Sequence, residues 1–134
     1  MNSQAPAPGG KKATILVVED DADVRRMLTY VLGAIGDVTA CGDGEQALDV
    51  LLNGLRPDVI VTDLMMPKMD GLTLAKELKK DPALARIPLV MLTAKSAARD
   101  VIAGINAGAR HYVTKPFKTE ELVGKVRKAL TGRA

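Results

Sequence analysis

The chain has 134 residues, which suits one domain of ordinary size, and its 47% hydrophobic and 26% charged residues give a globular balance. Aromatic residues make up only 2%, so functions that need base-stacking platforms or an aromatic cage are disfavoured. The net charge of +3 comes from the chain ends, because without Lys11, Lys12 and Arg133 the remaining 16 basic residues face 16 acidic ones, which disfavours a nucleic-acid-binding surface.

The first predicted segment, residues 1–12, is a disordered tail, because it is rich in proline and glycine and has no apolar stretch for a signal peptide. The folded domain is predicted over residues 13–131, with a short tail at 132–134 and no second domain. No run approaches 18 apolar residues, so we expect no membrane insertion and a cytoplasmic location. Cys41 is the only cysteine, and we expect it to be a buried apolar residue at a strand end.

Five short apolar runs along the chain predict strands, the first of them buried on both faces. In chain order they are Ala13–Val18, Asp37–Cys41, Asp58–Thr62, Pro88–Leu92 and the weaker, edge-like Arg110–Thr114. Each is followed by apolar residues at helical spacing, over Val24–Ile35 closed by Gly36, Ala47–Leu55, Leu74–Leu78, Ala98–Ile105 and Leu122–Leu130. Five strand–helix units predict a doubly wound α/β domain with a parallel sheet covered on both faces.

Polar residues follow the predicted strands, where ligands of such sheets bind. They are Glu19, Asp20 and Asp21 after the first strand, Asp43 after the second, Asp63 after the third, Thr93 after the fourth and Lys115 after the fifth. Each has a simpler explanation as a helix cap, a loop stabiliser or a solvated side chain, and Asp21, Asp23 and Asp70 suit helix caps especially well. His111 suits a surface position. The convergence of acids from two strands on one edge nevertheless indicates a site.

Clustered carboxylates repel one another unless a cation joins them, and a hard oxygen-binding ion such as Mg²⁺ fits an acidic cluster without histidine or cysteine. With such an ion, a carboxylate can attack a phosphoryl group to form an aspartyl phosphate. A nearby ammonium would neutralise charge on the transferred oxygens, and the Thr93 hydroxyl can donate to them.

The motifs ILVVEDD at 15–21, DLMMPKMDG at 63–71, LTA at 92–94 and YVTKPF at 112–117 resemble the receiver domain of two-component response regulators. The resemblance covers residues 13–131. The family that the chain resembles includes the single-domain chemotaxis regulator. It implies a flavodoxin-like (βα)5 fold with strand order 2-1-3-4-5. It also implies a phosphoacceptor switch in signal transduction or a phosphorelay, not an enzyme that turns over an external substrate.

Site roles follow from the resemblance, position by position. Asp63 resembles the phosphoacceptor, and the Mg²⁺ ligands would be Glu19, Asp20, Asp63 and the backbone carbonyl of Met65. Thr93 resembles the switch hydroxyl, and Lys115 resembles the phosphate-contacting lysine, whose bond to Pro116 is usually cis. Tyr112 resembles the aromatic residue that rotates inward on activation.

The expected switch follows from the charge of about −1.5 to −2 that phosphorylation adds. Thr93 and Lys115 would be drawn toward this charge, and Tyr112 would then move inward. The face that changes would be formed by the fourth predicted helix, the fifth strand and the fifth helix. The expected partners are a histidine kinase or phosphotransfer protein and a downstream protein target, in a monomer or weak dimer.

Two differences from the family pattern lead to further predictions. GARHY at 108–112 stands where many DNA-binding members have GADDY, which puts their mode of dimerisation in doubt. The bulky Met65, which with Lys95 flanks the site, should hinder an attacking water and give a long-lived phosphoaspartate. Met65 also stands where aspartyl-nucleophile phosphatases carry a general acid, which disfavours that class.

Two further alternatives remain. A phosphorylation-independent interaction module is disfavoured by the complete set of site residues. A flavin or nucleotide site is disfavoured by the anionic EDDADV segment at 19–24, which has no glycine-rich phosphate loop.

Overall fold

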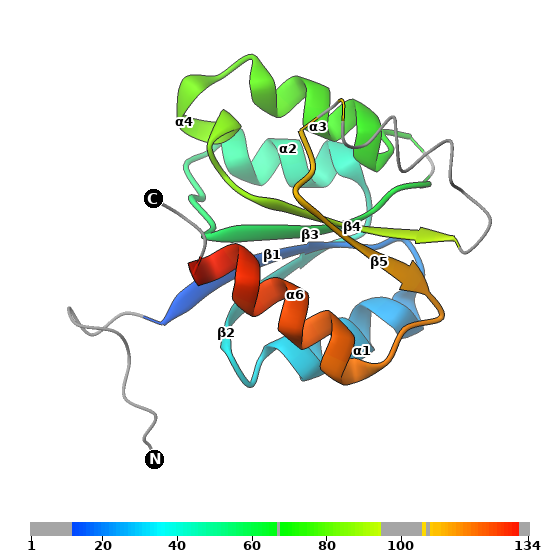
Figure 1. Ribbon diagram of the computed structural model, residues 1–134. Helices are drawn as coiled ribbons and strands as arrows, with labels where there is room; N and C mark the ends of the chain where they lie inside the picture. Colours follow the sequence, from blue (N-terminus) through cyan, green and yellow to red (C-terminus); the bar gives the residue numbers. More distant parts are fainter. Residues whose placement is uncertain (1–11, 67, 95–105, 107, 132–134) are drawn as a thin grey trace.

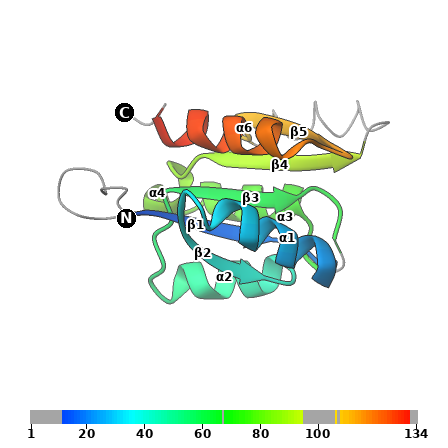
Figure 2. The ribbon, with the colours of Figure 1, turned by 90° about the horizontal axis from the view of Figure 1, so that it is seen from below.

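A five-stranded parallel sheet forms the centre of the molecule in the computed structural model, which describes residues 12–66, 68–94, 106 and 108–131. The strands are β1 (Ala13–Val18), β2 (Gly36–Cys41), β3 (Val59–Asp63), β4 (Leu89–Ala94) and β5 (His111–Lys115). They lie in the order β2-β1-β3-β4-β5, which can be followed in Figure 2. The expected fold class and strand order are therefore confirmed.

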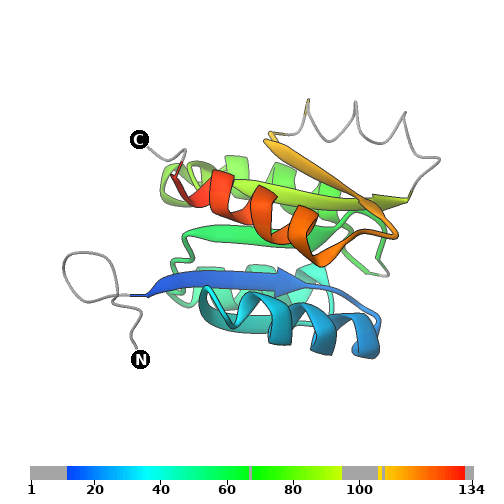
Figure 3. The ribbon, with the colours of Figure 1, turned by 60° about the horizontal axis from the view of Figure 1, so that its bottom comes forward.

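Helices cover both faces of the sheet, as Figure 1 shows. α1 (Ala22–Leu32) and α6 (Thr119–Thr131) lie on one face, seen in front of the sheet in Figure 3. α2 (Gly44–Leu52), α3 (Gly71–Lys79) and the short α4 (Pro82–Ala85) lie on the other. The helix predicted over Ala98–Ile105 lies outside the described residues, as do most of the predicted N-terminal tail and residues 132–134. None of the described helices is long and apolar enough to span a membrane.

The core has two layers, because successive side chains of a strand point to opposite faces of the sheet. Ile15 and Val17 pack with α1 and α6, whereas Leu16 and Val18 pack with α2 and α3. All four are fully buried. This explains why the first strand is continuously apolar. Cys41, at the end of β2, is buried as expected.

The first predicted helix ends earlier than expected. The prediction closed it at Gly36, but α1 ends at Leu32 with Gly33 as its C-cap, and Gly36 is the first residue of β2, paired with Ala13. A side chain at position 36 would lie 2.6 Å from the Ala13 carbonyl oxygen. Gly36 is therefore required by close strand pairing and not by the end of a helix.

The short helix α4 was not predicted. Asp81 caps it by accepting a hydrogen bond from the Ala83 amide at 2.9 Å, and Pro82 occupies its first turn. The capping aspartate and the proline are a recognisable start signal. However, four residues contain too few turns to show helical periodicity.

Asp70 caps α3, as the sequence suggested, by accepting a hydrogen bond from the Thr73 amide at 2.8 Å. We expect Asp70→Ala to lower the free energy of unfolding by about 1 kcal/mol, because the amide loses its acceptor. Asp49→Ala is the matched control, since Asp49 is exposed within α2, and it should change stability by less than about 0.5 kcal/mol. Urea titrations of both variants measure the difference. Equal stability of the two variants would contradict the cap.

Candidate functional site

The loop after β1 is acidic and tightly held. The Glu19 amide donates to the Cys41 carbonyl at 3.0 Å, which continues the pairing of β1 with β2 beyond the strand end. The Asp21 amide donates to the Glu19 carboxylate at 3.0 Å. The Arg25 guanidinium donates to the Glu19 carbonyl at 2.8 Å and to the Asp20 carbonyl at 3.4 Å. Backbone and side chain of Glu19 are thus fixed before any ligand binds.

Asp21 is the N-cap of α1, and its carboxylate accepts hydrogen bonds from the Asp23 and Val24 amides. The Val24 hydrogen bond is the main cause that lowers the pKa of Asp21. Asp23 lies within the first turn and forms an ion pair with Arg26. Asp21 therefore has the capping role that the sequence suggested, and Asp23 is not the cap.

Asp63 is the last residue of β3, and its side chain meets Lys115, the last residue of β5. The Lys115 ammonium lies 3.0 Å from the Asp63 carboxylate and 3.0 Å from the Glu19 carboxylate. Glu19 is 1% exposed and Asp63 is 8% exposed, so both acids are buried. One cation thus bridges two buried acids from different strand ends, and the Lys115–Pro116 bond is cis.

Burial raises the pKa of Glu19, and the nearby Asp63 charge adds to that effect. Hydrogen bonds from the Asp21 amide and from Lys115 act in the opposite direction without cancelling the rise. Burial alone would lower the pKa of Lys115, but its hydrogen bonds with Asp63 and Glu19 outweigh burial and raise it. The ammonium therefore stays charged and compensates the acids.

Glu19, Asp20 and Asp63 form an acidic cluster in which one carboxylate oxygen of each lies within 4.8 Å of the others. Glu19 and Asp63 are buried, whereas Asp20 is exposed. Three hard oxygen donors open to solvent on one side suit Mg²⁺, which binds a few carboxylates and keeps several waters. The donor set fits the ion that the sequence predicted.

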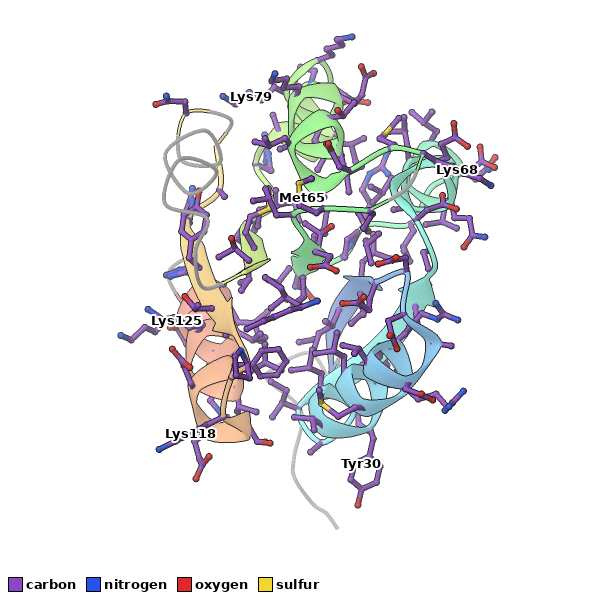
Figure 4. The ribbon with its side chains drawn as sticks, turned by 90° about the vertical axis from the view of Figure 1, so that its right-hand side faces the viewer. Tyr30, Met65, Lys68, Lys79, Lys118 and Lys125 are labelled. Carbon is purple, nitrogen blue, oxygen red and sulfur yellow. The ribbon has the colours of Figure 1, made fainter. Side chains whose placement is uncertain are left out.

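The loop from β3 to α3 forms the rim of this cluster. Met65 is 65% exposed, and Figure 4, which faces the carboxyl ends of the strands, shows it near the middle of the view. Gly71 packs against the backbone carbonyl of Asp63 so closely that any side chain at position 71 would collide with it. Gly71 therefore fixes the distance between α3 and the end of β3.

Thr93 and Tyr112 lie on neighbouring strands. Thr93 is buried near the end of β4, and Tyr112 is half-buried in β5 opposite Met91. The Tyr112 hydroxyl is buried, and it has no hydrogen-bond partner within the described ranges. Burial raises the pKa of Tyr112. Tyr112 thus already packs against the core layer on the α2 and α3 face.

His111 lies at the surface, where it is half-buried. Burial lowers its pKa, and the charges of Lys125, Lys128 and Arg110 add to this effect. The imidazole is therefore neutral near pH 7, and it lies on a basic part of the surface.

Sequence reasoning missed two contacts that hold the site. Arg25 secures the acidic loop, as described above, and Lys68 of the β3–α3 loop lies 3.7 Å from the buried Asp43 carboxylate, which also caps α2. Asp43 was predicted only as a residue at a strand end. The Lys68 contact joins segments that become neighbours only through the fold, so no local pattern indicates it. Arg25 lies only five and six residues from its partners, but it contacts backbone carbonyls, which a sequence pattern does not single out.

Comparisons with known proteins identify the family of the chain. The response regulator receiver domain family matches residues 15–127. The chain is 47% identical over 117 residues to the DNA-binding response regulator MtrA of Mycolicibacterium paratuberculosis, an alignment that covers 87% of this chain and 50% of that protein. It thus spans about half the length of this relative.

Solved receiver domains share the fold. The receiver domain of a signal transduction histidine kinase from Syntrophus aciditrophicus superposes with a TM-score of 0.81 at 36% identity, covering 90% of this chain and 91% of that one. The chemotaxis response regulator CheY4 of Vibrio cholerae gives 0.82 at 30% identity, covering 90% and 100%. The chain belongs to the response regulator receiver domain family of two-component systems.

Proposed function

We propose that Asp63 accepts a phosphoryl group from the phosphohistidine of a histidine kinase or phosphotransfer protein, in a Mg²⁺-dependent reaction. The observation that carries the proposal is the position of the Asp63 carboxylate, 3.0 Å from the Lys115 ammonium and within the acidic cluster. A solitary buried acid would be costly. Here a lysine and a cation-binding cluster surround it, as phosphoryl transfer requires.

The transfer step uses these groups in defined roles. An Asp63 carboxylate oxygen attacks phosphorus, the bond from phosphorus to the imidazole nitrogen breaks, and that nitrogen keeps the electron pair and takes up a proton. Mg²⁺ held by Glu19, Asp20, Asp63 and the Met65 carbonyl would neutralise charge on the transferred oxygens. Lys115 exchanges its contact with Asp63 for the new phosphoryl oxygens, and the Thr93 hydroxyl donates to another.

The proposed output is a shift between two conformations. The phosphoryl group stabilises the state in which Thr93 and Lys115 are drawn toward Asp63, and Tyr112 follows. The face that changes includes β5, α6 and the helix predicted over Ala98–Ile105. A protein target that prefers the shifted face would read the signal, whereas a constitutive interaction module would bind its target regardless of phosphorylation.

Incubation with a small phosphodonor such as acetyl phosphate tests the proposal directly. We expect a mass increase of one phosphoryl group with Mg²⁺ present and none after chelation. Labelling that is equally efficient in chelator would contradict the metal-dependent role of the cluster.

Mg²⁺ affinity should depend on pH through Glu19. Because burial raises the pKa of Glu19, this acid holds its proton at a higher pH than an ordinary glutamate does. Proton and metal compete, so affinity should fall as pH falls through this raised pKa and should reach its full value above it. Calorimetric titrations with Mg²⁺ at pH 5 and pH 8 measure the effect. In Glu19→Gln the overall affinity should be lower and its dependence on pH weaker, and unchanged dependence would contradict the role of Glu19.

A further inference from the structure

A concave region lies at the opposite edge of the sheet from the acidic cluster. It is a cleft of about 650 Å³ whose walls include Arg56, Asp58, Arg86, Ile87 and Arg110. These residues precede β3, β4 and β5, whereas Asp63 and Lys115 end β3 and β5. Figure 1 shows the strand arrows pointing away from the edge where α4 lies. The cleft is therefore separate from the proposed phosphorylation site.

Three arginines from three different segments line this cleft. All three arginines are exposed. Neither Arg86 nor Arg110 forms an ion pair with any acid in the described part of the chain. Like charges gathered in one place repel one another, so an anion bound between the arginines would be attracted by all three.

The cleft is held by backbone contacts that do not depend on a ligand. Nη1 of Arg56 donates to the Leu51 and Leu55 carbonyls at 2.8 and 2.9 Å, which anchors this side chain at the end of α2. The other two guanidinium nitrogens of Arg56 carry three more N–H groups. The Arg110 amide donates to the Leu89 carbonyl at 3.1 Å. The Arg56 side chain and the Arg110 backbone are thus held in place by contacts within the protein.

Among the described residues, Asp58 is the one acid that lines the cleft. Its carboxylate accepts a hydrogen bond from the Thr14 amide at 2.8 Å, and its own amide donates to the Thr14 carbonyl at 2.7 Å. Asp58 is therefore engaged in joining the starts of β1 and β3. With this acid counted against the three arginines, the wall still carries a formal charge of +2.

We propose that this cleft binds a small anion that carries at least two phosphate groups. Guanidinium groups match phosphate oxygens through paired hydrogen bonds, and three of them around one space suit phosphates linked in a chain. A volume of about 650 Å³ exceeds the needs of a single phosphate and lies within the usual range for small-molecule sites. Such a ligand would act at the edge opposite Asp63, so the inference does not depend on the proposed phosphorylation.

Titration of the ¹⁵N-labelled protein with inorganic pyrophosphate, in EDTA, tests the proposal. We expect saturable amide shifts at Arg56, Ile87 and Arg110. Arg86→Gln and Arg110→Gln should each weaken binding about tenfold, because each removes a charged hydrogen-bond donor. Arg127→Gln is the control, since Arg127 is exposed on α6, on the other face of the sheet, and should leave affinity unchanged.

Several results would overturn the proposal. Absence of saturable shifts at millimolar pyrophosphate would do so, as would shifts confined to Asp63 and Lys115. An equal loss of affinity in Arg127→Gln would indicate a general charge effect without a site. Binding of a poly-glutamate peptide in place of pyrophosphate would assign the cleft to an acidic protein segment. All three arginines are exposed, so the variants should fold, and their amide spectra verify this.

Discussion

Asp63→Asn is expected to abolish phosphorylation by acetyl phosphate and by a phosphohistidine donor, with labelling reduced at least about a hundredfold. The amide side chain is neutral and cannot act as the attacking carboxylate. It also removes one of the three acids of the cluster, so Mg²⁺ affinity should fall. Intact mass measurements on wild type and variant, at matched donor and Mg²⁺ concentrations, give the result.

Asp49→Asn is the matched control for this loss. Asp49 is exposed on α2 and is not one of the three acids of the cluster, so this variant should be labelled like wild type. Asp63→Asn should also remain folded, because it relieves repulsion between two buried carboxylates while Glu19 keeps its contact with Lys115. Full labelling of folded Asp63→Asn would place the phosphoryl group elsewhere.

Lys115→Ala is expected to lower the free energy of unfolding by about 2 kcal/mol in the absence of Mg²⁺. The substitution leaves the Glu19 and Asp63 carboxylates buried side by side without their shared cation, and breaking a fully buried pair costs about 3–5 kcal/mol. The Lys115 side chain is 30% exposed, so water reduces the penalty. Added Mg²⁺ should restore stability, because it replaces the missing charge.

The same variant should bind Mg²⁺ about tenfold more tightly than wild type, because the ammonium no longer repels the metal ion. Urea unfolding with and without Mg²⁺ measures both effects. Lys118→Ala is the control, since Lys118 is exposed (Figure 4) and makes no ion pair within the described residues. If Lys115→Ala matched Lys118→Ala in stability and Mg²⁺ response, Lys115 would not balance the acids.

The parallel sheet was predictable because its central strands are short apolar runs buried on both faces, as Ile15 to Val18 illustrate. Its strand order was predicted from the resemblance to receiver domains. The boundaries of the strands were less predictable from the sequence. Asp63, Thr93 and Lys115 were placed after their strands but belong to the last two residues of β3, β4 and β5. Backbone hydrogen bonds continue the strand pairing into these positions. The polarity of a side chain does not indicate whether the backbone of its residue is paired.

The candidate site was predictable as a set of residue types but not as a set of contacts. Parallel strands bring their carboxyl ends to one edge, so the meeting of Glu19, Asp20 and Asp63 followed from the strand pattern. The bridging of Glu19 and Asp63 by Lys115 depends on side-chain reach across the sheet. No spacing in the sequence encodes that reach.

The arginine cleft was even less predictable from the sequence than the contacts of the acidic cluster. Arg56, Arg86 and Arg110 are isolated basic residues in three loops, and each alone is an ordinary solvated side chain. They face one space because the amino ends of β3, β4 and β5 are adjacent in the sheet. A run of basic residues in the sequence would have indicated an anion-binding site, whereas three separated arginines do not.

Borohydride reduction of the phosphorylated protein, followed by peptide mass spectrometry, tests the central claim most directly. An acyl phosphate on an aspartate is reduced to the alcohol, which converts the residue to homoserine. We expect this conversion at Asp63 alone, with Mg²⁺ present, and at no aspartate in chelator. Homoserine at any other aspartate, or a phosphoryl group that resists reduction, would contradict the assignment of Asp63 as phosphoacceptor.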